Sequence, residues 1–189
     1  RRQIKLSRIA DGYQELLLER NQTLSSEATR DPLTQIANRR GLHDELRRLV
    51  AAAMRHQRPF TLAMLDIDHF KRFNDTMGHE VGDQALVAVA NGLGQTLRLG
   101  DLLGRWGGEE FLIALPGAPI GAATPLFDRL RERLLKLEFT KGDQTLALTV
   151  SIGATEHRDQ ESYETTLRRA DAALYEAKRE GRDRWKIAD

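Results

Sequence analysis

The feature that most restricts the fold is a short, largely apolar run at residues 60–67 whose end carries two carboxylates, Asp66 and Asp68. A continuous apolar run of this length is typical of a strand buried inside a sheet. Carboxylates at the end of such a strand cost free energy unless water, a basic side chain or a bound cation neutralises them. We therefore expect a buried strand that ends at a charged site.

A second pair of acids, Glu109 and Glu110, directly follows Gly107-Gly108 between strand-like stretches at 102–106 and 111–115. The pattern predicts a hairpin in which the glycines take positive φ at the turn. The missing side chains would also let a bulky anionic ligand approach the backbone. The hairpin is thus expected to present carboxylates beside a site open to an anion.

If this hairpin neighbours the 60–67 strand, four carboxylates converge: Asp66, Asp68, Glu109 and Glu110. A set of oxygen donors without cysteine is typical of Mg²⁺ or Mn²⁺, which proteins use to bind and activate phosphates. Phosphoryl transfer is the chemistry indicated. The Asp-x-Asp pattern alone is equally compatible with a solvated strand end or a helix N-cap.

The order of the remaining elements favours an α+β fold with helices on one face of a sheet, rather than a strictly alternating doubly wound fold. Asn38 is the expected N-cap of the helix that follows it. The expected elements are helices at 39–56, 68–77, 81–97, 126–135 and 167–179, and strands at 60–67, 102–106, 111–115, 146–152 and 185–187.

Residues 1–29 are expected to form a separate helical stalk, and residues 30–189 the folded domain. Apolar residues in the first segment follow helical spacing, which fits either a short coiled coil or a capping helix packed on the domain. Asp31-Pro32 should stop this helix, because the residue before a proline avoids helical backbone angles. The absence of an initiator Met suggests a fragment of a longer protein.

Composition excludes several classes of protein. The 189 residues contain no cysteine, which excludes a disulfide-stapled scaffold. The longest uncharged stretch, 111–127, contains three prolines and is too short to span a bilayer. A cytoplasmic location is expected, with tethering to the inner membrane through an upstream segment as an alternative. A formal net charge of +1 gives no strong field for nucleic acid, so no nucleic-acid partner is expected.

Basic and polar side chains suited to a nucleotide lie in other segments. Lys71, Lys178 and Arg182 could clamp a triphosphate, with Lys178 and Arg182 four residues apart on one face of the last helix. The alternative for the latter pair is that it complements the helix dipole. Asn74 and Asp83 fit either helix caps or guanine recognition, because a carboxylate accepts the N1 and N2 hydrogens of guanine.

Five segments in order, 31–40, 66–75, 78–83, 105–111 and 175–182, together resemble the GGDEF-domain diguanylate cyclases, here with the variant Gly-Gly-Glu-Glu-Phe. The resemblance runs from about Thr29 to Ile187. It implies a fold like nucleotide-cyclase and polymerase palm domains, with a ferredoxin-like βαββαβ core and a mainly antiparallel sheet flanked by helices. It also implies bacterial second-messenger signalling of the kind that controls biofilms: a homodimer condenses two GTP into cyclic di-GMP and releases two pyrophosphates.

The resemblance further implies a role for each matching residue. Asp66 and Glu109 look like side-chain ligands of two Mg²⁺ or Mn²⁺ ions, assisted by the Ile67 carbonyl. Glu110 resembles either the general base for the 3′-hydroxyl or a further metal-associated carboxylate. Asn74 and Asp83 resemble guanine-reading residues. The other residues expected beside the substrate are Phe70, Lys71, Arg105, Gly107, Gly108, Lys178 and Arg182.

Arg98-x-x-Asp101 matches the family's inhibitory site for cyclic di-GMP, and Arg129 is where the family often adds another arginine. The alternative for Arg98 and Asp101 is a surface ion pair of little energetic consequence. Gln35 and Trp106 depart from the family pattern without touching the expected metal or base residues.

Three functional hypotheses follow. The first is an active cyclase whose stalk sets dimer geometry in response to an upstream sensory domain or a separate regulatory protein. The second is a receptor that binds GTP or cyclic di-GMP without catalysis, against which the intact Glu109-Glu110 pair argues. The third is a cyclase that is active only when a partner binds the stalk.

Overall fold

The computed structural model describes residues 28–189. The stalk expected over residues 1–29 therefore lies outside the described residues except for its last two, and it stays a prediction. Five strands form the central sheet in the order β2-β3-β1-β6-β7. They are β1 (Phe60–Ile67), β2 (Leu102–Arg105), β3 (Glu110–Pro116), β6 (Val150–Glu156) and β7 (Trp185–Ile187). Only the β6–β7 pair is parallel, so the sheet is mainly antiparallel as expected.

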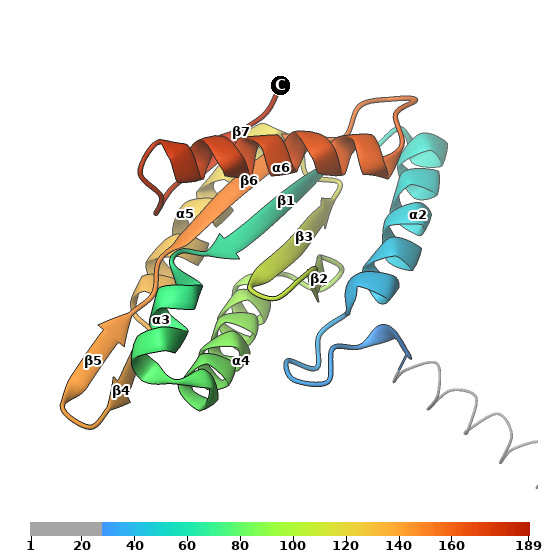
Figure 1. Cartoon of the computed structure of the whole chain (residues 1–189). Helices are drawn as coiled ribbons and strands as arrows, with labels where there is room; N and C mark the ends of the chain where they lie inside the picture. Colours follow the sequence, from blue (N-terminus) through green and yellow to red (C-terminus); the bar gives the residue numbers. More distant parts are fainter. Residues whose placement is uncertain (1–27) are drawn as a thin grey trace, which may run out of the picture.

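Helices cover both faces of this sheet (Figure 1). On one face, α2 (Arg39–His56) and α6 (Tyr163–Arg179) pack over Leu62 and Met64 of β1. On the other, α4 (His79–Thr96) and α5 (Ile120–Leu135) pack over Ala63 and Leu65. The prediction of helices on one face only is wrong. The physical reason is visible in β1, where every residue is buried, because a strand covered on both sides carries apolar residues without alternation.

Local signals place the helix ends. The side chain of Asn38 accepts a hydrogen bond from the backbone N–H of Gly41 (2.9 Å), which confirms it as the N-cap of α2. The helix α3 (Phe70–Met77) ends at Gly78, whose φ of 85° favours glycine, and α4 begins directly afterwards.

Two helices begin at least four residues earlier than expected. The helix α5 starts at Ile120 and includes Pro125, which cannot donate to the Gly121 carbonyl; the Thr124 hydroxyl donates to that oxygen instead (3.2 Å). The helix α6 starts at Tyr163 because Ser162 caps it.

The strand expected at 146–152 is wrong in its bounds. It is divided between β5 (Gln144–Ala147) and β6, and β5 pairs with β4 (Glu138–Lys141), a strand that was not expected. The β4–β5 hairpin lies beyond the end of β1 (Figure 1), where Phe139 makes an edge-to-face contact with Phe73 of α3 (ring centroids 5.5 Å apart). Within residues 28–189, no helix is both long enough and apolar enough to cross a bilayer.

Candidate active site

The strand register brings the two acidic segments together. Asp66 of β1 lies opposite Glu110 of β3, and the backbone N–H of Ile67 donates to the carbonyl of Glu109 (3.3 Å). The helix α6 runs across the sheet and ends over the same edge (Figure 1). There the ammonium of Lys178 lies 2.9 Å from Oδ2 of Asp66.

The carboxylates at this edge are destabilised as anions. Burial raises the pKa of Asp66, while its ion pair with Lys178 opposes the shift. Burial also raises the pKa of Glu109 and of Glu110, and the negative charge of Asp66 adds to both shifts. Three carboxylates that repel one another at the mouth of a sheet favour binding of an additional cation.

Asp68 lies near the same site, because its negative charge adds to the raised pKa of Asp66. It differs from the other three carboxylates in its partners. Its oxygens accept hydrogen bonds from the hydroxyls of Thr149 (2.8 Å) and Ser151 (2.7 Å) and from the backbone N–H of Asp183 (3.1 Å). The side chain is buried and joins the end of β1 to β6 and to the turn after α6. Its role is structural, because its oxygens are already occupied by neutral donors.

The turn between β2 and β3 depends on glycine for a different reason from the one expected. Neither Gly107 nor Gly108 has a positive φ, so that part of the prediction is wrong. A Cβ at Gly107 would lie 2.6 Å from Oε2 of Glu110, whereas a Cβ at Gly108 would meet nothing within 4 Å. The first glycine thus makes room for the Glu110 carboxylate, and the second leaves the hairpin open to solvent.

Arg105, expected beside the substrate, braces the hairpin in this structure. Its guanidinium donates to both carboxylate oxygens of Asp31 (3.1 and 3.2 Å) and to the carbonyl of Gly108 (2.7 Å from Nη2). This link could not be predicted from the sequence, because Arg105 and Asp31 are 74 residues apart and no spacing rule connects them. A direct contact of Arg105 with a nucleotide stays a prediction.

Lys178 and Arg182 do not share a helical face as predicted, because α6 ends at Arg179. Arg182 lies in the following turn with a φ of 63°, and its Nη1 donates to the carbonyl of Lys178 (3.5 Å). Its positive charge still opposes the rise that burial causes in the pKa of Asp66, so Lys178 and Arg182 both act on the same carboxylate.

The expected guanine-reading residues come together at the start of α4. A Cβ at Gly82 would lie 1.9 Å from Oδ1 of Asn74, so only glycine allows α3 and α4 to approach this closely. That Oδ1 is buried without a hydrogen-bond partner among the described residues, and Asp83 beside it is exposed. On α3, Lys71 is exposed, but Phe70 is buried and stacks on Phe73 (ring centroids 6.0 Å apart). Only the backbone of Phe70 is therefore available to a ligand.

The residues expected to form an inhibitory site also lie together. Arg98, Asp101 and Arg129 line one cavity of about 280 Å³ beside the start of α5. Nε of Arg98 lies 3.0 Å from Oδ1 of Asp101, and Nη2 of Arg98 donates to the Pro116 carbonyl (2.7 Å). The ion pair that was the alternative interpretation is therefore present, within a cavity that a ligand could enter.

The donor set at the acidic edge fits a hard divalent cation. Across residues 28–189, no three carboxylate or imidazole side chains are arranged to hold one metal ion by themselves. Mg²⁺ is commonly bound by one or two carboxylates together with substrate phosphates. Asp66, Glu109 and the Ile67 carbonyl match that arrangement in number and chemistry.

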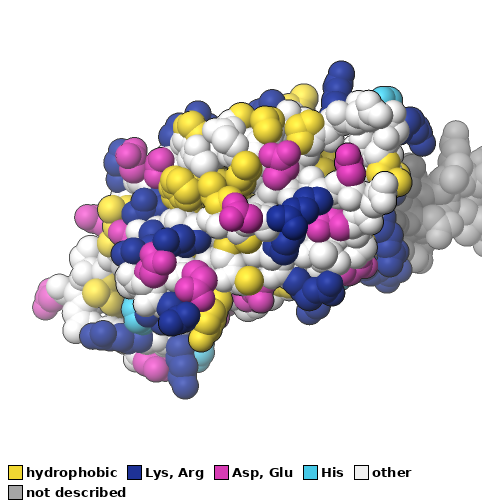
Figure 2. Space-filling model, turned by 90° about the horizontal axis from the view of Figure 1, so that it is seen from above, with side chains coloured by type: hydrophobic (Ala, Val, Ile, Leu, Met, Phe, Trp, Pro, Cys, Tyr) yellow, Lys and Arg dark blue, Asp and Glu magenta, His cyan; other side chains and the backbone are white. Residues whose placement is uncertain are grey.

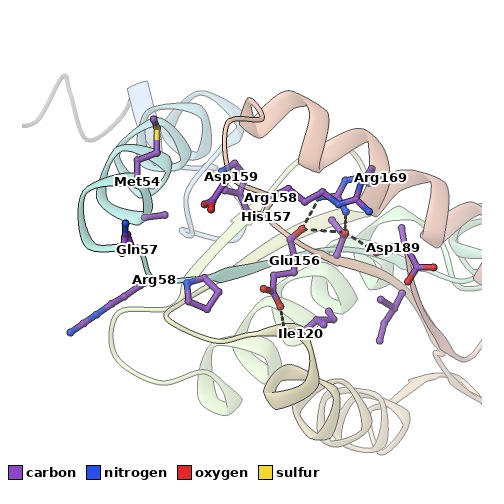
Figure 3. Close-up of a pocket in the computed structure, with 15 residues that line it drawn as sticks. Met54, Gln57, Arg58, Ile120, Glu156, His157, Arg158, Asp159, Arg169 and Asp189 are labelled. Carbon is purple, nitrogen blue, oxygen red and sulfur yellow. Dashed lines mark hydrogen bonds between the residues drawn. The ribbon is translucent and has the colours of Figure 1, made fainter.

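A larger cavity, of about 810 Å³, lies elsewhere, between the end of α2, the residues after β6 and the end of the described chain (Figure 3). Two of its charged groups are already bonded: Glu156 accepts from the Ile120 N–H (2.7 Å), and Nη2 of Arg169 donates to the Glu156 carbonyl (2.7 Å). On the face seen from above, acidic and basic side chains alternate without a large region of one sign (Figure 2). Volume alone therefore does not locate the chemistry of this protein.

A mainly antiparallel sheet with acids at the end of its central strand and at the neighbouring hairpin defines a palm-like nucleotide-cyclase domain. A family model described as "Diguanylate cyclase, GGDEF domain" matches residues 28–184. The chain belongs to this GGDEF family.

Known proteins agree with that assignment. The chain is 43% identical over 161 residues to diguanylate cyclase DgcP of Pseudomonas aeruginosa, covering 85% of this chain and 24% of that protein. It is 41% identical over 173 residues to the probable diguanylate cyclase DgcC of Escherichia coli K12, covering 91% and 46%. The chain thus spans less than half the length of these curated relatives.

Solved structures show the same fold. The coiled coil and GGDEF domain of DgcB from Caulobacter crescentus, in complex with c-di-GMP, matches with a TM-score of 0.89 and 36% identity, over 96% of this chain and 98% of that one. Diguanylate cyclase SiaD of Pseudomonas aeruginosa, in complex with its activator SiaC, matches with a TM-score of 0.84 and 46% identity, over 100% and 72%.

Proposed function

We propose that this domain is an active diguanylate cyclase that condenses two GTP into cyclic di-GMP and two pyrophosphates. The observation that carries the proposal is the register that sets Asp66 opposite Glu110, with Lys178 bound to Asp66 at 2.9 Å. Family membership supports it, since the matching family and several relatives carry the name diguanylate cyclase.

In the proposed reaction, each 3′-hydroxyl loses its proton and its oxygen bonds to the α-phosphorus of the other nucleotide. The bond from that phosphorus to the bridging oxygen of the β-phosphate breaks, and pyrophosphate leaves. Two such displacements close the ring. Each domain binds one GTP, so two copies must face one another for the groups to meet.

The residues of the chain have distinct tasks in this scheme. Asp66, Glu109 and the Ile67 carbonyl would hold Mg²⁺ or Mn²⁺, which would neutralise phosphate charge and favour loss of the 3′-hydroxyl proton. Lys178 and Arg182 bind the triphosphate, and a phosphate oxygen replaces Asp66 as the partner of the Lys178 ammonium. Asn74 and Asp83 orient the guanine, and the exposed carboxylate of Asp83 can accept the N1 and N2 hydrogens of the base.

Glu110 either accepts the proton of the 3′-hydroxyl or adds a carboxylate to the cation site. Burial and the negative charge of Asp66 raise the pKa of Glu110, a direction that suits a proton acceptor, whereas a cation bound beside it would oppose that rise. Glu110→Gln should abolish turnover in both cases, whereas the acid limb of the pH–rate profile of Glu110→Asp should shift only if this group accepts the proton.

The test is chromatography of purified protein, stripped of nucleotide and incubated with GTP and Mg²⁺ over a series of protein concentrations. Cyclic di-GMP whose specific rate rises with protein concentration supports a dimeric cyclase. GTP binding without product at any concentration would instead leave a receptor, or a cyclase that requires a partner. The structure of SiaD with its activator is the observation that favours adding a regulatory protein to such an assay.

We also propose that cyclic di-GMP inhibits the enzyme at the cavity of Arg98, Asp101 and Arg129. The two arginines suit phosphates, and a GGDEF structure from Caulobacter crescentus contains c-di-GMP. Arg98→Ala should relieve inhibition by added product while the initial rate stays unchanged. An unchanged inhibition constant would contradict this assignment.

A further inference from the structure

Arg39, the first residue of α2, is a cation without an acidic partner among residues 28–189. Its guanidinium carbon lies 4.6 Å from the ring centroid of Trp106, and its side chain forms none of the ion pairs in that part of the chain. Arg105, Arg131 and Arg169 are by contrast each bound to a carboxylate. An aromatic face attracts a guanidinium without using its N–H donors, so all five donors of Arg39 remain available.

Trp106 fixes Arg39 relative to the acidic hairpin. The backbone N–H of Trp106 donates to the carbonyl of Glu110 (2.8 Å). The Trp106 ring contacts His43 of α2 (centroids 5.0 Å apart), and Nδ1 of His43 is hydrogen-bonded to the hydroxyl of Tyr163 at the start of α6 (2.9 Å). Three elements therefore meet at the tryptophan, and the residue that stacks on the cation is bonded directly to Glu110.

Arg39 lines two adjoining cavities beside this hairpin. One, of about 290 Å³, is bounded by Arg39, Trp106 and the turn glycines, and its acid Asp31 is already bound to Arg105. The other, of about 680 Å³, carries three arginines and one aspartate. Burial raises the pKa of Glu110, and the positive charge of Arg39 opposes that rise, which places the cation within electrostatic reach of the carboxylate. In each cavity the arginines outnumber the acidic side chains, so the net charge of the lining is positive and suits an anion.

We propose that Arg39, held on Trp106, binds a phosphate group of the nucleotide substrate at the cavity beside Gly107 and Gly108. The proposal rests on the proposed function, which supplies the nucleotide. Lys178 acts on Asp66 from α6 and Arg39 acts on Glu110 from α2, so cations from two helices reach the acidic edge. The phosphate belongs either to GTP bound in the same domain or to the nucleotide carried by a second copy of the chain.

The test compares Arg39→Gln with Arg48→Gln, because Arg48 is on the same helix, pairs with Glu45 at 2.6 Å and lines neither cavity. Two quantities are measured: the affinity of dilute, monomeric protein for a non-hydrolysable GTP analogue with Mg²⁺, and the rate of cyclic di-GMP formation. Arg39→Gln should lower at least one of them by about tenfold or more, the range for a charge-assisted hydrogen bond. Its affinity for guanosine and its melting temperature should equal those of Arg48→Gln.

The pattern of loss identifies the source of the phosphate. A weaker affinity for the GTP analogue assigns the phosphate to the same domain, whereas an unchanged affinity with a slower rate assigns it to the second copy. Arg39→Lys should restore part of the loss, since it keeps the charge, and Trp106→Leu should reproduce part of it with Arg39 intact.

Equal affinity and equal rate for Arg39→Gln and Arg48→Gln would overturn the proposal. So would an equal loss of guanosine affinity, which would show a general disturbance of the site. If the wild-type chain makes no cyclic product, the proposed function fails separately. The affinity for the GTP analogue then decides the role of Arg39 alone, and equal affinities overturn it.

Discussion

Replacing Gly107 with alanine should displace the Glu110 carboxylate without unfolding the domain. The new Cβ would lie 2.6 Å from Oε2 of Glu110, about 0.8 Å inside the 3.4 Å at which ordinary van der Waals contact begins. Neither backbone strain nor a rigid neighbour is involved, because φ at this position is not positive and the obstructing atom ends a flexible side chain. The free energy of unfolding should therefore change by less than about 1 kcal/mol.

Activity should respond much more strongly than stability. A misplacement of about 1 Å in a reacting group can cost on the order of 100-fold in rate. We expect kcat of Gly107→Ala to fall by roughly ten- to a hundredfold, measured as initial rates of cyclic di-GMP formation at saturating GTP. Glu110→Asp withdraws the carboxylate by one methylene, so Gly107→Ala should cost less in that background than in the wild type.

Gly108→Ala provides the comparison, because its Cβ meets no protein atom within 4 Å. Its methyl group enters the space beside the nucleotide, so its effect should appear in KM. The reasoning is refuted if Gly107→Ala keeps the wild-type kcat, or if the cost of Gly107→Ala is the same in both Glu110 backgrounds.

Three further predictions concern a close backbone contact, the Lys178–Asp66 ion pair and a buried histidine. Gly153→Ala should destabilise the domain by about 3 kcal/mol or more in urea unfolding, because its Cβ would lie 2.0 Å from the backbone N of Leu174, which cannot move aside. Lys178→Met should lower the free energy of unfolding by about 1 to 3 kcal/mol, because the loss of this partly buried ion pair should cost more than that of an exposed pair and less than that of a fully buried one. It should also lower kcat/KM, and unchanged kinetics would contradict a triphosphate contact. Burial lowers the pKa of His157 below its ordinary value of 6.5. As the pH falls below 6.5, the unfolded state therefore protonates this imidazole before the folded state does. The stability present above pH 6.5 should be lost as the pH falls further. Unfolding of His157→Gln should lose that slope, whereas unfolding of His79→Gln should keep it.

Much of the fold follows from the sequence, because its strongest signals are local. The N-cap Asn38 acts through a neighbouring backbone N–H and is confirmed, as is the predicted end of α3 at residue 77. The covering of both sheet faces was missed, although the unbroken burial of β1 follows from an apolar run that was visible. The β4–β5 hairpin was missed although Gly142-Asp143 between its strands is a local turn signal, and its position is set by the contact of Phe139 with the distant Phe73.

The acidic residues of the candidate site could be predicted from the sequence, but the groups that each of them contacts could not. The Asp-x-Asp spacing alone does not distinguish Asp66 from Asp68; the family resemblance selects Asp66, and the structure shows what each residue contacts. Asp68 is bonded to residues 81, 83 and 115 positions away, none of which a local pattern could identify. The Arg39–Trp106 contact was missed for the same reason, although both residues lie within recognised segments.

The difference between the two aspartates also separates structural from reactive acids at this edge. Neutral donors satisfy Asp68 permanently, because hydroxyl and backbone groups in packed elements cannot leave. Asp66 is satisfied by one ammonium on a side chain that is 30% exposed, and that ammonium can be transferred to a phosphate. The same criterion applies to the arginines: Arg105 is fixed by Asp31, whereas Arg39 rests on a ring and keeps its donors. Asp66, Lys178 and Arg39 therefore keep groups that can change partners, as the proposed nucleotide contacts of Lys178 and Arg39 require.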